Sequence, residues 1–181
     1  MPSSVPLGPQ FQVSPTLGPP EVPPAVAIVD GAGDFIAVWQ SYGTDGDGYG
    51  IYAQLFDANG APIDLNGNTL NDDAFRVNTT TLGNQMAPAV ASDGAGHFVI
   101  AWQGEVQNVA TQTSNYDIFS EQGSYLGGAL TQGGELQANT LHTTGNQLFP
   151  TVAMDASPDA KFVIAWQSET TDPVTGNDIY A

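Results

Sequence analysis

The chain has 181 residues, enough for one domain with a hydrophobic core, and its 41% apolar content argues against global disorder. Nineteen acidic residues against two basic ones give a formal charge of −17, a balance that disfavours binding to nucleic acids and to anionic membranes. Such a charge fits a soluble protein that meets divalent cations, salt or a basic partner, or it serves solubility alone. The absence of cysteine excludes disulfide scaffolds, thiolate metal sites and cysteine nucleophiles.

Residues 1–10 are predicted to form a proline-rich tail, with neither the basic nor the apolar region of a signal peptide. A short strand is expected next, at Phe11-Gln12-Val13, and similar segments recur downstream. The corresponding segments are Phe75-Arg76-Val77-Asn78 and Leu136-Gln137-Ala138-Asn139.

Each of these strands is followed by a loop and then by a strand that begins with proline. The loop ends in Gly-Asn-Gln at 83–85 and 145–147, whereas the first copy has Pro19-Pro20-Glu21. Proline is tolerated at the first position of a strand, where its missing N–H breaks no ladder hydrogen bond. The three strands are Pro24-Ala25-Val26-Ala27, Pro88-Ala89-Val90-Ala91 and Pro150-Thr151-Val152-Ala153.

An aspartate opens the next turn in every copy, at Asp30, Asp93 and Asp155. Asp followed by Gly between two apolar runs is typical of a hairpin, because Gly accepts a positive φ and Asp can bond to its own turn. Since the aspartate recurs in register, we predict that it caps the turn, with metal binding as the alternative.

The following strand is the strongest repeated feature and contains every tryptophan of the chain. In Phe98–Gln103, Phe98, Ile100 and Trp102 face one side and the residues between them face the other. Both sides are mostly apolar, so the sheet is expected to lie between two neighbours. We therefore predict that the tryptophans pack in the core, with sugar stacking as the alternative: Trp39, Trp102 and Trp166.

Variable loops at 41–50, 104–115 and 168–177 lead to a third strand in each copy. Four short strands repeated at a fixed period predict an all-β, β-propeller-like array of three four-stranded blades, with a β-solenoid as the runner-up. The repeats span 11–73, 74–134 and 135–181, and the third is truncated after its third strand.

The repeated segments together read roughly Val-Asn-Thr, Gly-Asn-Gln, Pro-x-Val-Ala, Phe-Val-x-Ala-Trp-Gln and Ile-Tyr-Ala-Gln, and residues 74–103 and 135–168 match this pattern best. This resembles the repeats of bacterial cell-surface and secreted proteins. The resemblance covers nearly everything after residue 10. It implies a propeller-like array in a large exported protein, often a calcium-associated adhesin or surface protein, and hence an extracytoplasmic location. It carries over no catalytic residues.

Three blades are fewer than the usual four to eight, and an open arc exposes two apolar blade faces. We expect that residues 11–14 complete the third blade and that the arc is then closed. Two copies in a six-bladed ring, a longer parent chain, or a partner protein are the three ways to close it.

Two groups of residues are candidates for binding. Alternate aspartates on a glycine-rich loop, Asp45 and Asp47, suit a hard cation such as calcium, with a solvated turn as the alternative. Four tyrosines in or beside the variable loops are candidates for contacts with a ligand or partner, with ordinary loop packing as the alternative: Tyr42, Tyr49, Tyr116 and Tyr125.

No catalytic residue is predicted. The two histidines, His97 and His142, do not recur between copies, and no Gly-x-Ser-x-Gly motif is present. Glycan hydrolysis would require acidic residues that are not shared between copies to converge from different blades. The residues considered for this role are Glu105, Glu121, Glu169 and Asp172.

The expected function is that of a non-catalytic binding or scaffold module of an exported acidic protein, acting as an accessory subunit or an adhesin segment. Its expected partner is another protein, or copies of itself, covering the open blade ends, without nucleic acid or membrane insertion. Calcium is the only cofactor considered. The alternative is a carbohydrate-binding or glycan-hydrolysing propeller, with or without calcium dependence.

Overall fold

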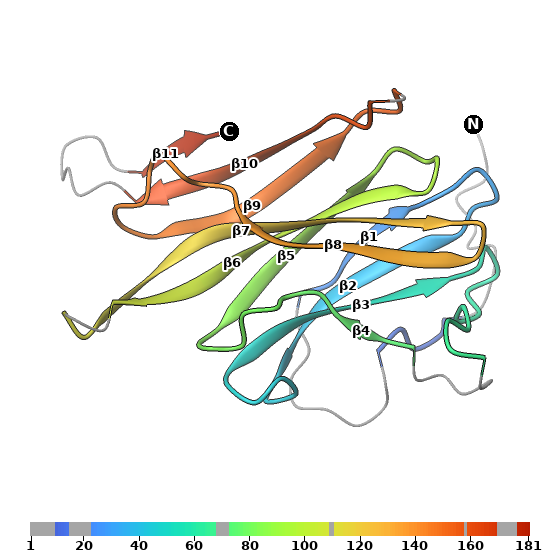
Figure 1. Ribbon diagram of the computed structural model, residues 1–181, viewed down its shortest axis with the longest axis horizontal. Coiled ribbons are helices and arrows are strands. Elements are labelled where there is room, and N and C mark those ends of the chain that lie inside the picture. The colour runs from blue at the N-terminus through green and yellow to red at the C-terminus, as the bar shows by residue number, and fades with distance from the viewer. Residues whose placement is uncertain (1–9, 15–22, 68–72, 109–110, 158, 170–176) are drawn as a thin grey trace.

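A computed structural model describes residues 10–14, 23–67, 73–108, 111–157, 159–169 and 177–181. This part of the chain contains eleven strands in three antiparallel sheets and no helix (Figure 1), which confirms the predicted all-β class. No helix long and apolar enough to cross a membrane occurs among these residues.

Each sheet is built from consecutive strands. The first has the order β1 (Ala25–Ile28), β2 (Phe35–Tyr42), β3 (Tyr49–Phe56) and β4 (Phe75–Arg76). The second has the order β5 (Gln85–Ser92), β6 (His97–Asn108), β7 (Thr113–Leu126) and β8 (Ala129–Gln137). The third has the order β11 (Asn177–Tyr180), β10 (Phe162–Glu169) and β9 (Gln147–Met154).

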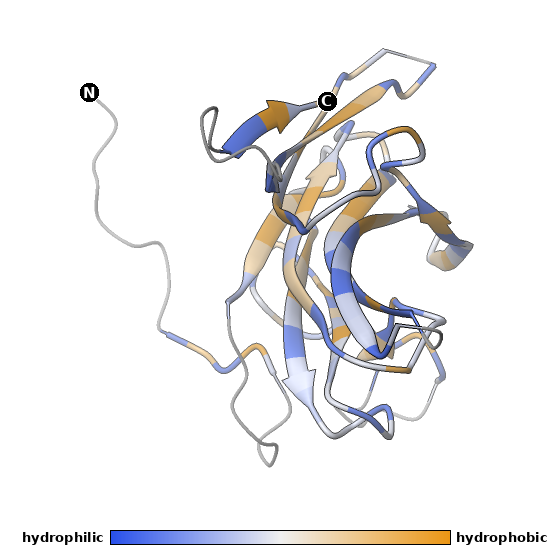
Figure 2. Cartoon of the chain, turned by 90° about the vertical axis from the view of Figure 1, so that its left-hand side faces the viewer, coloured by the Kyte–Doolittle hydropathy of each residue, from blue (hydrophilic) through white to orange (hydrophobic). Residues whose placement is uncertain are grey.

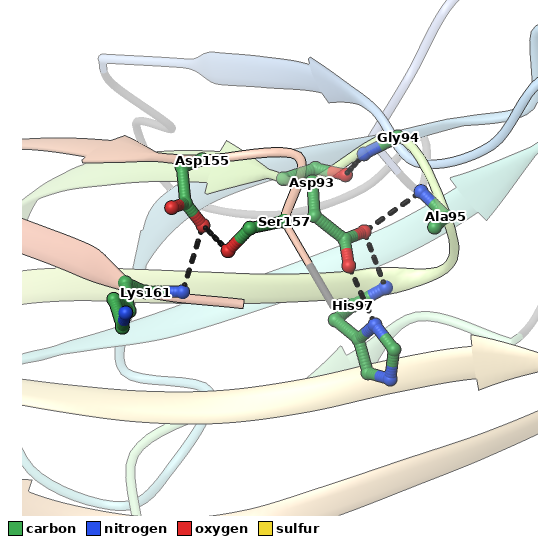
Figure 3. Close-up of polar contacts among 8 residues, drawn as sticks. Asp93, Gly94, Ala95, His97, Asp155, Ser157 and Lys161 are labelled. Atoms are coloured by element: carbon green, nitrogen blue, oxygen red, sulfur yellow. Dashed lines mark hydrogen bonds and ion pairs between the residues drawn. The ribbon is translucent and has the colours of Figure 1, made fainter. Parts of the chain in front are cut away.

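Aspartates close the hairpins between the first two strands of each sheet. Oδ1 of Asp30 accepts hydrogen bonds from three successive backbone N–H groups, those of residues 32–34, at 2.9–3.1 Å. Oδ1 of Asp93 accepts from the N–H of Ala95 and His97, and Oδ1 of Asp155 accepts from Lys161 N–H (Figure 3). The side chains therefore satisfy backbone donors that the turns leave without a ladder partner.

Alternation along the tryptophan strands divides the core into two layers. Phe98, Ile100 and Trp102 of β6 join residues of the first sheet in one cluster. Ala101, on the opposite face of β6, joins Ile164 and Trp166 of the third sheet in the other. The second sheet is thus covered by apolar neighbours on both faces, as its two-sided apolar pattern predicts.

The sheets follow one another in chain order. β5 contacts β1, β2 and β3 of the first sheet, and β9 contacts β5, β6 and β7 of the second. Each later sheet therefore lays its first strand against the sheet before it (Figure 1).

The second sheet is longer than its sequence pattern indicates. Residues 104–115 were expected to form a loop, but β6 and β7 stay paired to Asn108 and Thr113. This ribbon lacks apolar alternation because most of its outer residues are exposed. β8 likewise begins at Ala129, well before the predicted strand at residues 136–139.

The expected strand at Phe11–Val13 does not form in this chain. The Phe11 ring instead packs on the first sheet, with ring centroids 6.3 Å from Phe35 and 5.7 Å from Phe56. Gly60, with a φ of 84°, lies beneath this ring, where a Cβ atom would collide with it. Phe11 therefore covers part of the first sheet, and residues 11–14 do not complete the third. The rest of the predicted tail, residues 1–9, lies outside the described residues.

Candidate functional site

The glutamine of each Gly-Asn-Gln motif binds a tryptophan. Oε1 of Gln85 accepts from Nε1 of Trp102 at 3.2 Å, and Oε1 of Gln147 accepts from Nε1 of Trp166 at 2.9 Å. All three tryptophans, including Trp39, are buried. A buried indole whose N–H has an acceptor acts as a packing residue and offers no exposed ring face to a sugar.

The asparagine of the same motif joins its own sheet to the preceding one. Oδ1 of Asn84 accepts from Tyr49 N–H at 3.3 Å, and Oδ1 of Asn146 accepts from Tyr116 N–H at 3.1 Å. The amide nitrogens donate to carboxylates on the tryptophan strands, namely Glu105 at 2.8 Å and Glu169 at 2.6 Å.

Glu105 and Glu169 are therefore shared between copies, contrary to the expectation from sequence. Both follow the tryptophan by three positions, and both accept from a motif asparagine. Partial burial acts to raise the pKa of Glu105, but hydrogen bonds from Ser114 and Asn84 outweigh it and lower the pKa. The Glu105 carboxylate therefore holds the loop that contains Asn84 against the tryptophan strand.

A second contact, which we call the glutamine clasp, recurs between neighbouring sheets. Oε1 of Gln40 accepts from Ala87 N–H at 2.8 Å, and Oε1 of Gln103 accepts from Phe149 N–H at 3.0 Å. Both donor residues precede a strand proline and have left-handed backbones, with φ of 52° and 53°. This conformation lies at a register shift in each sheet and frees the N–H from the ladder.

A third contact, the asparagine clasp, fastens the end of the fourth strand to the third. Ile51 N–H donates to Oδ1 of Asn78 at 2.7 Å while Ile51 C=O accepts from Val77 N–H at 2.8 Å. In the second sheet, Ile118 makes the same pair of bonds with Oδ1 of Asn139 and the N–H of Ala138.

The third sheet carries the same residues on a face that the described chain leaves uncovered. We call Val163, Ala165, Gln167 and Ile179 the third outer face. Val163 is 52% and Ile179 73% exposed, whereas their counterparts Val99 and Ile118 in the second sheet are fully buried. Gln167 is partly exposed, whereas Gln40 and Gln103 are buried. Figure 2 shows the hydrophobic part of β11 beside the C-terminus.

The predicted metal ligands take part in contacts within the protein. Oδ2 of Asp45 accepts from Nδ2 of Asn78 at 3.2 Å, and Oδ2 of Asp47 accepts from Gly83 N–H at 3.1 Å. Within the described ranges, no three acidic or histidine side chains gather in a way that could hold a metal ion. Calcium binding at this loop stays a prediction.

Three of the four candidate tyrosines lie close to Asn84, which bonds the Tyr49 N–H and the Tyr116 side chain, while Tyr42 contacts Tyr49. Tyr42 and Tyr49 contact each other across β2 and β3, with ring centroids 5.1 Å apart. Tyr116 lies opposite Glu105 in the long hairpin of the second sheet. Burial, and then the charges of nearby Asp34 and Asp30, raise the pKa of Tyr125.

The described acidic residues and histidines considered for catalysis are buried or contact other residues of the chain. Glu121 is 2% exposed and pairs across strands with Ile100 and Glu135. His97 binds Asp93, whereas the ring of His142 packs on Tyr180 at a centroid distance of 4.2 Å. Asp172 lies outside the described residues.

Sequence reasoning missed the glutamine and asparagine clasps. Their signal is present, because Gln40, Gln103 and Gln167 close every tryptophan strand and Asn78 and Asn139 follow both complete fourth strands. A polar residue at a strand end resembles a solvent-facing one until its neighbour is known.

Comparisons with known proteins add no relative to these observations. No protein-family model matches the chain, and no curated protein or solved structure is detectably similar to it.

Proposed function

We propose that this chain is a non-catalytic binding module of an exported protein, built as a propeller-like arc, and that it docks another protein on the third outer face. The module acts as a scaffold, either as an accessory subunit or as a segment of an adhesin. The carbohydrate alternative is not carried forward, because Glu105 and Glu169 each bind a motif asparagine and the three tryptophans are buried.

Three features support the propeller-like arrangement. Two sheets have four antiparallel strands in sequential order, as blades do. The first strands of successive sheets are neighbours, since β5 contacts both β1 and β9. The same clasps also recur at both junctions, so each sheet repeats the relation of the previous pair.

The repetition of one docking face carries the proposal. The outer faces of the first and second sheets bury their apolar residues and satisfy their glutamines against the next sheet. The third outer face has the same residue types in the same register. Its glutamine, Gln167, pairs with an isoleucine of the next strand, as the glutamines of the other two sheets do. An apolar surface of this kind with a polar group at a fixed place is typical of a protein interface.

A second copy of this chain does not supply the matching surface. Pro23 occupies the position of Ala87 and Phe149, directly before the strand proline. Proline has no N–H and cannot adopt a positive φ, so the first sheet of another copy cannot complete the glutamine clasp at Gln167. The ring of Phe11 also covers part of that sheet. The matching surface is therefore a β-sheet that presents a free N–H before its strand proline.

Charge narrows the partner further. The formal charge of −17 repels acidic proteins and attracts basic ones, with an association rate that falls as salt rises. A stable complex needs roughly 800 Å² buried on each side, so the partner must cover the whole third sheet.

Site-specific photo-crosslinking in the cells that make the protein tests this proposal. A crosslinking amino acid replaces Val163 or, as a matched control, Val26, which is 66% exposed on the first sheet. We expect a defined protein adduct from position 163, weakened by Gln167→Ala, and none from position 26. Equal adducts at both positions, or none at 163, would contradict the proposal.

Sedimentation of the purified chain separates the two kinds of partner. A species of 18.8 kDa is expected, because the third outer face lacks its partner in the pure protein. A stable dimer that Val163→Asp dissociates would show that the face binds a second copy, which would overturn the choice of a different protein.

A further inference from the structure

We infer that the edge of β11 accepts an extended strand of a defined sequence pattern, and that an asparagine in this strand determines its specificity. The inference rests on the proposed function and deepens it, because the third outer face and the edge of β11 belong to the same sheet. Docking on the third outer face requires only side-chain contacts, whereas this inference adds main-chain hydrogen bonds at the edge of β11.

Register identifies the backbone groups that would accept the strand. Ile51 lies opposite Gln40, Ile118 opposite Gln103, and Ile179 opposite Gln167. The N–H and C=O of the first two isoleucines point to the fourth strand, where the asparagine clasp engages them. By the same register, Ile179 directs its N–H and C=O to the outer edge of β11.

β11 is an edge strand in the described part of the sheet, since its neighbour there is β10 alone. An exposed edge with a row of main-chain donors and acceptors is a template for strand addition. The main-chain bonds supply affinity in this mode, and side-chain contacts supply specificity.

A cavity of about 420 Å³ lies beside this edge. Its walls come from the segment after β8 and from β10 and β11, and they include Leu141, His142, Phe162, Trp166 and Tyr180. The cavity is therefore partly aromatic and opens next to the edge where the added strand would lie.

The first junction shows what fills the corresponding place. There, Oε2 of Glu135, in the fourth strand β8, accepts from the N–H groups of Thr79 and Thr80 at 2.8 and 3.1 Å. Thr140 and Leu141 hold the same positions after Asn139. A strand that carries a glutamate at this place would supply the carboxylate for their N–H groups.

These contacts define the sequence of the added strand. Residues 135–139 provide the pattern of a glutamate, an apolar residue, any residue, a small apolar residue and an asparagine. The chain's own segment at 11–14 fits less well, because Ser14 replaces the asparagine and Phe11 is packed on the first sheet. That segment is therefore not the strand that the edge of β11 accepts.

A peptide titration followed by NMR tests the inference on the intact chain. The probe is a blocked peptide with the sequence of residues 134–140, and the ¹⁵N-labelled protein is observed. We expect saturable chemical-shift changes at the amides of Ile179 and Tyr180 and at the indole N–H of Trp166. The expected Kd is about 1 mM. The equivalent signals of Ile118 and Trp102, which belong to a complete sheet, should stay in place.

The matched control is the same peptide with alanine at the asparagine position. We expect it to bind at least about tenfold more weakly, since it loses the amide that holds both a main-chain donor and an acceptor. Equal affinity of the two peptides, or no shift at Ile179 at about 5 mM peptide, would overturn the inference.

Hydrogen exchange provides a second measurement. The Ile179 N–H should exchange fast in the free protein and slow down with the peptide, whereas Ile51 and Ile118 should be protected throughout. If the peptide fails while the crosslink at Val163 persists, docking on the face stands and strand addition falls. If both fail, the proposed function falls with the inference.

Discussion

The second and third sheets carry nearly the same outer face in opposite surroundings. Val99, Gln103 and Ile118 are buried against a neighbour, whereas Val163 and Ile179 are largely exposed. The residue pattern therefore specifies a neighbouring sheet whether or not one is present. It follows that the exposed apolar residues of the third sheet indicate a docking face, because their counterparts in the second sheet pack against a neighbouring sheet.

The first and third sheets differ in the same way. The first sheet has Phe11 on its free face and Pro23 at the clasp position, so it is closed to a further sheet. The third sheet has Gln167 at the glutamine-clasp position and Ile179 at the asparagine-clasp position, and its outer face has no cover among the described residues. Matched substitutions at equivalent positions test this contrast.

The largest difference is expected for the paired isoleucines. Ile118→Ala leaves a cavity between two sheets and should lower the free energy of unfolding by about 3 kcal/mol. Ile179→Ala removes an exposed side chain and should change it by less than about 0.5 kcal/mol. Denaturant unfolding measures both, and similar losses at the two positions would break the comparison.

A second difference concerns Glu121, whose counterpart in the first sheet is Gln54. Burial first, and the charge of Glu135 to a smaller extent, raise the pKa of Glu121 to about 7, against a hydrogen bond from Gln132 that lowers it. The folded state thus holds a proton that the unfolded state releases near pH 4.5. The resulting stabilisation is complete below pH 4.5 and disappears as the pH rises through 7.

Glu121→Gln copies the residue of the first sheet and should remove this pH dependence. At pH 8 the variant should be more stable than the parent by about 2 kcal/mol, because a neutral amide replaces a buried carboxylate. Unfolding curves between pH 4 and 8 test the prediction. Parallel curves for variant and parent would show that Glu121 does not titrate in this range.

A smaller difference is expected for the glutamine clasp. Gln103→Ala leaves the Phe149 N–H without its acceptor and should destabilise the protein by about 1 kcal/mol. Gln167→Ala should leave the stability of the free chain unchanged and weaken only partner binding. Thermal melting of both variants checks this, and a loss at Gln167 in the free chain would mean that this glutamine already has a partner.

The smallest effect is expected at Asp47. Asp47→Ala removes the acceptor of Gly83 N–H and should cost about 0.5 kcal/mol, whereas Asp47→Asn retains an oxygen and should cost less. Melting each variant with and without calcium separates this contact from a metal site. Stabilisation by calcium that Asp47→Asn abolishes would support the predicted cation.

The sequence is sufficient to predict features whose cause is local or repeated. The tryptophan strands and the turn aspartates recur in register, so the hairpins at Asp30, Asp93 and Asp155 could be anticipated. The pairing of residues 104–115 could not, because a ribbon with solvent on its outer side has no apolar alternation. Phe11 was misplaced since its packing depends on which face of the first sheet is free.

The clasps were missed for a related reason. Gln40 and Asn78 act on backbone groups of other strands, and such partners become visible only when the sheets are placed together. Glu105 and Glu169 both follow a tryptophan by three positions, but their common role is seen only in the bond that each makes with a motif asparagine.

Pro23 gives the array a direction of growth. A gene duplication that adds another copy of the last unit would place a residue like Phe149 against the previous sheet and extend the stack. Duplication of the first unit would instead place a proline inside the array, and that junction would lack one hydrogen bond, worth about 1 kcal/mol. Lengthening at the third sheet is therefore favoured over lengthening at the first.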